Sequence, residues 1–238
     1  FKNVSFSYSN EKNLSNLNFQ IKKNTTIGIV GLSGSGKSSI IYLITKLLKP
    51  GSGKILIDNI DYEKISNISL RNLFGYISQE VSLFHGTIKD NISLYESKRD
   101  SMHLKKKIID VMHMAGCPEL KDRLNELVGD SVKTLSGGQR QRVAIARELF
   151  RDTKIILFDE ATSSLDSFSE NIINETINNL KGKKTILVIS HKIATIKKCD
   201  KIIVLSKGNI IQEGKFNTLW KNKNGLFRKL CNEQNLKK

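Results

Sequence analysis

Residues 31–38, Gly-Leu-Ser-Gly-Ser-Gly-Lys-Ser, have the composition and spacing of a loop that binds phosphate groups. They fit the pattern G-x-x-x-x-G-K-[ST], and they lie between an apolar β-branched segment (26–30) and a stretch with helical spacing (37–48). The glycines let backbone N–H groups surround phosphate oxygens, and the start of the helix adds partial positive charge. We therefore expect Lys37 to contact the β- and γ-phosphates of a nucleoside triphosphate and the Ser38 hydroxyl to bind Mg²⁺.

Two adjacent carboxylates, Asp159 and Glu160, follow the apolar run 155–158. A buried strand that ends in acidic residues presents them at the carboxyl edge of a parallel sheet, where ligands bind in open α/β folds. We expect Asp159 to hold Mg²⁺ through water. Glu160 is expected to orient, or to accept a proton from, the water that attacks the γ-phosphate. Acidic residues are common at strand ends, so this pattern is informative only together with the glycine loop.

A third segment, residues 135–139, is a glycine turn at the start of a helical stretch (138–151). Its N–H groups and the Ser136 hydroxyl can meet a phosphate as well as cap the helix. The segment is Leu-Ser-Gly-Gly-Gln, the signature of the ATP-binding cassette (ABC) family, which the chain resembles from Phe1 to about Lys229. The resemblance implies an ATPase that dimerises head to tail. Each ATP would lie between the glycine loop of one chain and the signature of the other.

The resemblance also implies roles for four residues outside these segments. Tyr8 would stack on adenine, Gln79 would contact Mg²⁺ and the attacking water, and His191 would contact the γ-phosphate; otherwise Tyr8 is a core aromatic and His191 a structural histidine. Asp166 belongs to the segment 164–166, where the two chains would meet. The predicted nucleotide contacts are Tyr8, Gly31, Ser33, Gly34, Ser35, Gly36, Lys37, Ser38, Ser39, Ser136, Gly137, Gly138, Gln139 and Asp166; the metal ligands are Ser38, Gln79 and Asp159; the catalytic residues are Glu160, His191, Gln79 and Lys37.

Residues 70–79 and 83–92 resemble the nucleotide-binding domains of ABC exporters. In those proteins the domain follows six membrane helices in the same polypeptide, and the segment after Gln79 faces them. The chain starts without an initiator methionine, which agrees with a piece of a longer protein at the cytoplasmic face of a membrane. The resemblance thus predicts hydrolysis of Mg-ATP that powers export, with a transmembrane domain and a second nucleotide-binding domain as partners. Both half-sites are intact, so we expect a homodimer, although a paralogue also fits; the cargo stays open among peptide, lipid, lipid-linked sugar and drug.

The elements that must position these residues alternate between strands and helices, which predicts an α/β fold: a P-loop NTPase core with a mixed, mostly parallel sheet. Antiparallel strands at 1–8 and 17–21 predict an N-terminal β subdomain. From 79 to 151 the pattern turns helical, which predicts an inserted α-helical subdomain, and residues 1–78 and 152–238 form the ATP-binding core. The remaining expected strands are 26–30, 52–58, 74–77, 155–158, 185–190 and the hairpin 201–205/210–213; the expected helices are 37–48, 102–115, 118–127, 138–151, 167–180 and an exposed or frayed basic helix in the tail 221–238.

One segment departs from the exporter pattern. Exporters usually carry a Thr-Glu-Val-Gly-Glu-Arg-Gly-like run before the signature, whereas residues 126–132 are Glu-Leu-Val-Gly-Asp-Ser-Val. Leu127 and Ser131 therefore stand where the usual glutamate and arginine would be. The change leaves the predicted ATP chemistry intact and alters the expected contacts with the membrane domain.

Composition narrows the alternatives. The net charge of +16, from 39 Lys and Arg against 23 Asp and Glu, is compatible with nucleic acid or an anionic membrane, but scattered lysines in an Asn- and Ile-rich chain favour a general compositional bias. A DNA-repair or ribosome-bound ATPase of the same superfamily is the alternative function. The roughly one hundred residues between Gly31 and Leu135 hold no heptad run, unlike the DNA-repair proteins, which insert a long coiled coil there. Ribosome-bound members usually carry two cassettes in tandem and lack the stretch Phe-x-Gly-Thr-Ile-x-x-Asn-Ile found at 84–92, so we expect no nucleic-acid partner. Three isolated cysteines argue against disulfides or zinc, and no apolar run is long enough to cross a bilayer.

Overall fold

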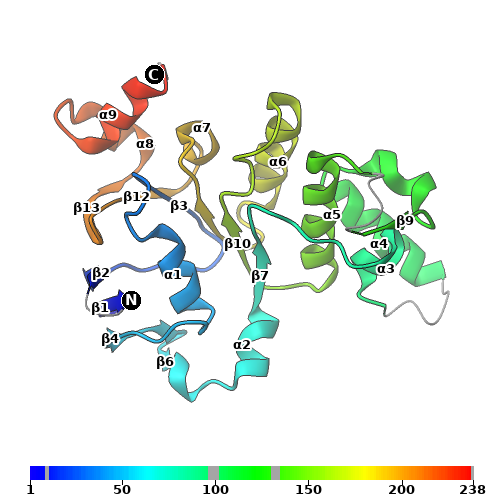
Figure 1. Cartoon of the computed structure of the whole chain (residues 1–238), viewed down its shortest axis with the longest axis horizontal. Coiled ribbons are helices and arrows are strands. Elements are labelled where there is room, and N and C mark those ends of the chain that lie inside the picture. The colour runs from blue at the N-terminus through cyan, green and yellow to red at the C-terminus, as the bar shows by residue number, and fades with distance from the viewer. Residues whose placement is uncertain (9–10, 96–101, 130–134, 237–238) are drawn as a thin grey trace.

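The computed structural model describes residues 1–8, 11–95, 102–129 and 135–236 (Figure 1). Its centre is a six-stranded sheet with the order β13-β12-β3-β11-β10-β7. Five neighbouring strands run parallel and β13 pairs antiparallel with β12 at one edge, which confirms the predicted α/β class. The strands are β3 (Thr26–Gly31), β7 (Phe74–Ile77), β10 (Ile155–Asp159), β11 (Thr185–Ile189), β12 (Lys201–Ser206) and β13 (Asn209–Gly214).

Side chains that alternate along the central strands build two cores, one on each face of the sheet. Ile156 and Phe158 of β10 pack into one core, and Leu157 between them packs into the other. The first core includes the helices that follow the glycine-rich signature. The second includes α1 (Lys37–Ile44) and the N-terminal strands. Because both faces are covered, the strands are apolar throughout, as expected for buried parallel strands.

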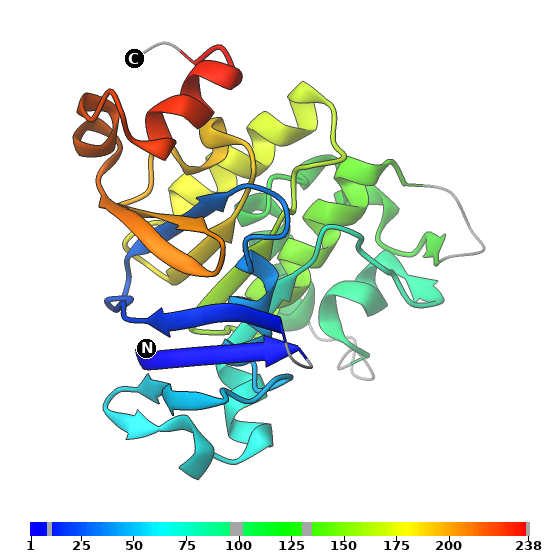
Figure 2. The same cartoon turned by 60° about the vertical axis from the view of Figure 1, so that its left-hand side comes forward.

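The N-terminal strands form a separate antiparallel sheet, ordered β2-β1-β4 (Figure 2). It consists of β1 (Lys2–Tyr8), β2 (Glu11–Leu17) and β4 (Ser52–Lys54). The predicted strand 17–21 is wrong, because the partner of β1 is residues 11–17, with Leu17 opposite Val4 and Leu14 opposite Phe6. Leu14 and Leu17 are both buried although they are three residues apart, because the pairing shifts register between them. This irregularity hides the strand from a search for strict alternation.

Two further predicted elements are shorter than expected. The helix α1 ends at Ile44 instead of residue 48, since Lys46 has a φ of 61° and the N–H groups of Leu47 and Leu48 turn back to the carbonyl of Tyr42. The predicted strand 52–58 is divided into β4 and β5 (Leu56–Ile57), and β5 forms its own hairpin with β6 (Ile60–Asp61).

Helices α3 (Ile88–Ser93), α4 (Met102–Met114) and α5 (Gly137–Phe150) gather at one end of the molecule (green in Figure 1). The predicted helix 118–127 is wrong beyond residue 123. Pro118–Arg123 form a 3-10 helix, and Leu127–Val128 (β9) pair with Gly86–Thr87 (β8). The N–H groups of Ile88 and Lys89 bond to the carbonyls of Glu126 and Leu124, which stops these carbonyls from continuing a helix.

The rest of the chain returns to the central sheet. It contributes α6 (Ser167–Leu180), α7 (Ile193–Ile196), α8 (Phe216–Lys221) and α9 (Leu226–Glu233); α2 (Asn67–Leu73) lies earlier. The tail is not the exposed helix that its lysines suggested, because α9 buries Phe227, Leu230 and Cys231 against the first core. Among the described residues, no helix has both the length and the apolar character that a bilayer crossing requires.

Candidate functional site

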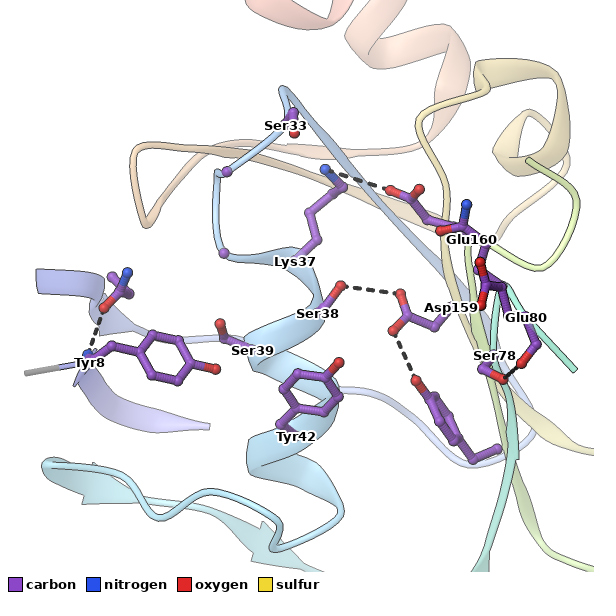
Figure 3. Close-up of a pocket in the computed structure, with 15 residues that line it drawn as sticks. Tyr8, Ser33, Lys37, Ser38, Ser39, Tyr42, Ser78, Glu80, Asp159 and Glu160 are labelled. Carbon is purple, nitrogen blue, oxygen red and sulfur yellow. Dashed lines mark hydrogen bonds and ion pairs between the residues drawn. The ribbon is translucent and has the colours of Figure 1, made fainter. Parts of the chain in front are cut away.

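A cavity of about 570 Å³ opens at the carboxyl edge of the central sheet, beside the start of α1 (Figure 3). It brings together segments that lie far apart in the sequence: the glycine loop, the ends of β7 and β10, and the N-terminal sheet. Its lining is Tyr8, Asn13, Ser33, Gly34, Gly36, Lys37, Ser38, Ser39, Tyr42, Tyr76, Ser78, Gln79, Glu80, Asp159 and Glu160. Most of the residues predicted for the nucleotide-binding loop therefore face one space.

The loop between β3 and α1 is shaped by its glycines. Gly36 has a φ of 95° immediately before the helix, in a region that residues with a Cβ rarely adopt. A Cβ on Gly31 would lie 2.2 Å from the carbonyl oxygen of Leu205, so the strand end can pack against β12 only as glycine. The loop thus bends with its N–H groups available near the N-terminus of α1, as anion binding requires.

Lys37 is the buried cation of the cavity. Its Nζ donates to the carbonyl oxygens of Gly31 and Leu32, both at 3.1 Å, and lies 4.0 Å from Oε1 of Glu160. Burial lowers the pKa of Lys37 below its ordinary value, and the nearby Glu160 and Asp159 carboxylates oppose this effect. Because the ammonium group already lies against the loop, a small rotation of the side chain can exchange its two carbonyl partners for a phosphate oxygen.

Asp159 lies opposite the start of α1 and accepts two hydrogen bonds. The Ser38 hydroxyl donates to Oδ1 at 3.3 Å, and the Tyr76 hydroxyl donates to Oδ2 at 3.1 Å (Figure 3). Burial raises the pKa of Asp159, and the two hydroxyl donors partly counter it. Within the described residues no three His, Cys, Asp or Glu side chains cluster as a metal site. A hydroxyl and a carboxylate in contact are nevertheless oxygen ligands that suit Mg²⁺ when phosphate oxygens and water complete the shell.

Glu160 has an unusual backbone, with a φ of 50° directly after β10. Its carboxylate lies between two groups predicted to meet the γ-phosphate: Oε1 is 4.0 Å from Nζ of Lys37, and Oε2 is 3.5 Å from Nδ1 of His191. Its backbone is fixed by the carbonyl of Ile189 and by donors from Ser163. A left-handed non-glycine residue held this firmly is typical of functional sites.

The remaining residues of the predicted loop differ in position. Ser33, Gly34 and Ser39 line the cavity, whereas the Ser35 hydroxyl is buried beside Gly31 and has no hydrogen-bond partner within the described part of the chain. Gly31 also lies outside the cavity lining and contributes its carbonyl to Lys37. Ser35 and Gly31 thus shape the loop from within.

Tyr8 stands at the mouth of the cavity, 44% exposed. Its backbone N–H donates to Oδ1 of Asn13 at 2.6 Å, and its ring contacts the Phe6 ring edge to face at 4.7 Å. One face of the ring is thereby fixed by the protein while the side chain lines the cavity. This arrangement suits stacking against a flat ligand such as a nucleobase.

The signature residues lie elsewhere. Ser136 caps α5: its hydroxyl accepts from the Gln139 N–H at 3.2 Å, and its own N–H donates to Oε1 of Gln139 at 3.0 Å. Ser136 and Gly137 line a second cavity, of about 720 Å³, together with Ser164 and Leu165. Gln79 lines both cavities. Within one chain, therefore, the described residues of the signature do not reach the cavity that holds Lys37 and Asp159.

Gly138 and Asp166 have structural partners in α6. A Cβ on Gly138 would lie 2.2 Å from Oγ of Ser169, so α5 and α6 meet closely at this glycine. The Asp166 carboxylate caps α6 by accepting from the Ser169 N–H at 2.9 Å, and this hydrogen bond holds the pKa of Asp166 below its usual value. Residues 130–132 of the segment with the altered exporter pattern lie outside the described residues; Leu127 is described, half exposed in β9.

Five residues that line the first cavity were missed by the sequence analysis: Asn13, Tyr42, Tyr76, Ser78 and Glu80. Tyr76 is the most consequential because its hydroxyl contacts the predicted metal ligand Asp159. Burial, followed by the charge of Asp159, raises its pKa above the ordinary value, so the hydroxyl stays protonated as a donor. The available signal in the sequence was a tyrosine within the short strand β7. Strand β7 pairs in parallel with β10, with Tyr76 opposite Leu157, and this register lets the Tyr76 hydroxyl contact Asp159.

A glycine loop that can surround phosphates at the carboxyl edge of a mostly parallel sheet is the arrangement of phosphate-loop nucleotide-binding proteins. The protein-family model for ABC transporters matches residues 14–163. ATP-dependent lipid A-core flippase 2 of Colwellia psychrerythraea is 41% identical over 238 residues, which are 98% of this chain and 40% of that protein. Leukotoxin translocation ATP-binding protein LktB of Mannheimia glucosida is 40% identical over 233 residues, which are 95% of this chain and 32% of that protein.

A solved structure of a bacterial Atm1-family ABC exporter with ATP bound matches the whole chain with a TM-score of 0.88 and 33% identity, over 42% of its own length. The chain belongs to the ABC transporter family, and its sequence and fold are those of the ATP-binding domain of an exporter. It spans less than half the length of these exporters.

Proposed function

We propose that the chain binds Mg-ATP in the cavity beside α1 and hydrolyses it as one half of a two-chain ATPase that powers export. ABC transporter ATP-binding domains are ATPases coupled to export, in agreement with the names of the relatives. The observation that carries the proposal is the convergence of Lys37, Ser38, Asp159 and Glu160 in the lining of the first cavity, with His191 next to Glu160.

Each of these residues has a part in the proposed reaction. Lys37 binds the β- and γ-phosphates, and Ser38, Asp159 and Gln79 are the groups that would hold Mg²⁺. When bound, Mg²⁺ would neutralise charge on the phosphate oxygens. Glu160 orients the water that attacks the γ-phosphorus and accepts its proton as the bond to the bridging oxygen breaks. Positioning and charge stabilisation supply most of the acceleration in such reactions.

We propose further that the site is completed by a second chain. In that arrangement the Ser136 hydroxyl and the N–H groups at Gly137 and Gly138, at the positive end of α5, contact the γ-phosphate held by the partner. Their distance from the first cavity within one chain supports this division of the site. We expect the partner to be a second copy of the same chain, because both half-sites are intact.

The wider setting is proposed on the relatives' names and lengths. Residues 1–78 and 152–238 would form the ATP-binding core and residues 79–151 the helical subdomain, in one nucleotide-binding domain of a longer protein at the cytoplasmic face of a membrane. Opening and closing of the dimer would move the transmembrane domain, which exposes a substrate site to each side in turn. The relatives' cargoes, lipid A-core and leukotoxin, are properties of those proteins.

Glu160→Gln tests the catalytic assignment. The amide keeps the size of the side chain but cannot take a proton, so we expect turnover to fall by about 10²- to 10⁴-fold. Affinity for ATP should change little, and the variant should accumulate as closed dimers with uncleaved ATP. Single-turnover hydrolysis and size-exclusion chromatography with Mg-ATP measure both effects. Normal turnover in this variant would show that Glu160 is not the group that handles the water.

A further inference from the structure

The loop that carries His191 is held by a residue from the C-terminal end of the chain. Gln234, which directly follows α9, donates from Nε2 to the carbonyl oxygen of His191 at 2.6 Å. Its Oε1 accepts from the backbone N–H of Ile193 at 2.8 Å. One primary amide therefore bonds to both sides of a short loop at the edge of the site. The two partners are 41 and 43 residues away in the sequence, so the contact is tertiary.

The loop needs these bonds because it ends in a helix start with no cap of its own. Ile193 is the first residue of α7, and the residue before it, Lys192, makes no capping hydrogen bond with its side chain. The first N–H groups of any helix lack partners inside the helix and must find them elsewhere. Gln234 supplies such a partner, and the same side chain fixes the carbonyl of the histidine itself.

The other side of the loop is fixed by different residues. The Ser190 hydroxyl accepts from the Lys192 N–H at 2.9 Å, and Nζ of Lys192 donates to Oε2 of Glu170 in α6 at 2.6 Å. His191 itself is half exposed, and the described structure ties its side chain only through Nδ1, 3.5 Å from Oε2 of Glu160. The backbone on either side thus sets where the imidazole points, and Gln234 is the contact that comes from the C-terminal end of the chain.

Gln234 can act as a fixed support because α9 is docked. Phe227 and Cys231 are fully buried in the first core and Leu230 nearly so. Beyond Gln234, the N–H of Leu236 returns to the carbonyl of Cys231, and its side chain packs against the same core. The amide is therefore presented by a segment anchored on both sides.

We propose that Gln234 is a positioning residue for His191: it holds the loop so that the imidazole meets the γ-phosphate and Glu160 in the closed site. The inference rests on the role of His191 under the proposed function. It predicts an effect on the chemical step and none on the binding of ATP, because Gln234 lies outside the cavity that holds the nucleotide.

The test compares Gln234→Ala, Gln234→Glu and the control Asn232→Ala in the 238-residue chain. Asn232 is an exposed amide on α9, and in the described structure its side chain makes no hydrogen bond to the loop. We expect Gln234→Ala to lower turnover about three- to tenfold with KM for ATP within about twofold, because a small displacement of a reacting group reduces the rate without changing ground-state binding. Gln234→Glu keeps the acceptor for Ile193 but turns a carboxylate oxygen toward the carbonyl of His191, which repels it, so its loss should be at least as large as that of Gln234→Ala. Asn232→Ala should match the wild type.

A double-mutant cycle separates positioning from general destabilisation. Single-turnover rates are measured with enzyme in excess over ATP, so that the rates of slow variants can still be measured. In a His191→Ala background, Gln234→Ala should cause no further loss, because the group that it positions is gone. Hydrogen exchange at the Ile193 amide should be several-fold faster in Gln234→Ala and unchanged in Asn232→Ala.

Three outcomes would count against the account, and they are distinct. Normal turnover of Gln234→Ala, with faster exchange at Ile193, would overturn the positioning role alone. An equal loss in both backgrounds would also overturn it, because Gln234 would then act through another group. Wild-type turnover of His191→Ala itself would instead refute the role of the histidine under the proposed function, whatever the Gln234 variants do.

Discussion

The cavity beside α1 and the cavity at the start of α5 contain the two segments that we propose bind phosphate, and they differ in how much of a site each one forms within a single chain. In the first, buried Lys37 and Asp159 already contact the loop and Ser38. In the second, Ser136 and Gly137 are exposed at a helix start, and the Ser136 hydroxyl and N–H bond to Gln139 within the capping box. One region has the geometry of a preformed binding site, and the other is an exposed helix start that we propose becomes part of a site only opposite a second chain.

This difference suggests a division of roles within one chain: the cavity beside α1 binds the nucleotide, and the start of α5 takes part in hydrolysis at the partner's site. Burial lowers the pKa of Lys37 and raises that of Asp159, because it destabilises the charged form of each side chain. A bound phosphate would stabilise the charged lysine, and a bound cation would stabilise the charged aspartate. The α5 start holds no acidic side chain in its first turn that would repel a phosphate. Gln79 and Glu80 line both cavities, so the two regions meet at these two residues.

The largest effect that separates the two regions is expected for Gly137→Asp. A Cβ at Gly137 meets its nearest neighbour outside the helix at 3.5 Å, an ordinary contact, and an acidic residue at a helix start favours the helix. The fold should therefore survive while the added carboxylate repels the partner's γ-phosphate. We expect turnover to fall by about 10²- to 10³-fold, with the affinity of the single chain for ATP within about twofold. A parallel loss of affinity, measured by nucleotide titration at low protein concentration, would break the division between the cavities.

Lys37→Ala should act in the opposite manner. Loss of a charge-assisted bond to phosphate costs about 1.5–3 kcal/mol, so ATP affinity of the single chain should fall about ten- to a hundredfold. Isothermal titration with ATP and with adenosine checks this, since adenosine lacks phosphates and should bind as it does to the wild type. Unchanged ATP affinity would remove the lysine from the binding site.

The smallest effect is on stability and sharpens the account of Asp159. Its folded pKa is raised by burial, so the ionised carboxylate costs stability above that pKa, and the cost disappears as pH falls through it. Asp159→Asn should therefore raise the melting temperature without nucleotide at pH 7 by about 1–3 °C, and the gain should shrink in acid. The same variant should lose magnesium-dependent hydrolysis. A lower melting temperature at pH 7 would mean that the hydrogen bonds from Ser38 and Tyr76 outweigh desolvation.

The sequence was sufficient for the residues that depend on parallel strands meeting at one edge. Lys37, Ser38 and Asp159 follow buried apolar runs, and such runs must place their ends together. Tyr76 was not predictable in the same way, because its contact depends on which strand lies beside β10. Strand 11–17 was missed because its pairing shifts register, and the docking of α9 was hidden by the lysines around Phe227 and Leu230. Gln234 has no local pattern at all, since its partners lie across the fold.

The most direct test of the divided site mixes two impaired chains, Lys37→Ala and Gly137→Asp, at an ATP concentration that saturates the wild type but leaves Lys37→Ala largely unbound. A mixed dimer pairs the intact loop of the second variant with the intact signature of the first, so one site of its two is whole. If dimers form at random, half of them are mixed, and hydrolysis should return to about a quarter of the wild-type rate. Each variant alone stays largely inactive under the same conditions. No recovery on mixing, with dimers shown to exchange chains, would contradict the claim that each ATP is hydrolysed between two chains.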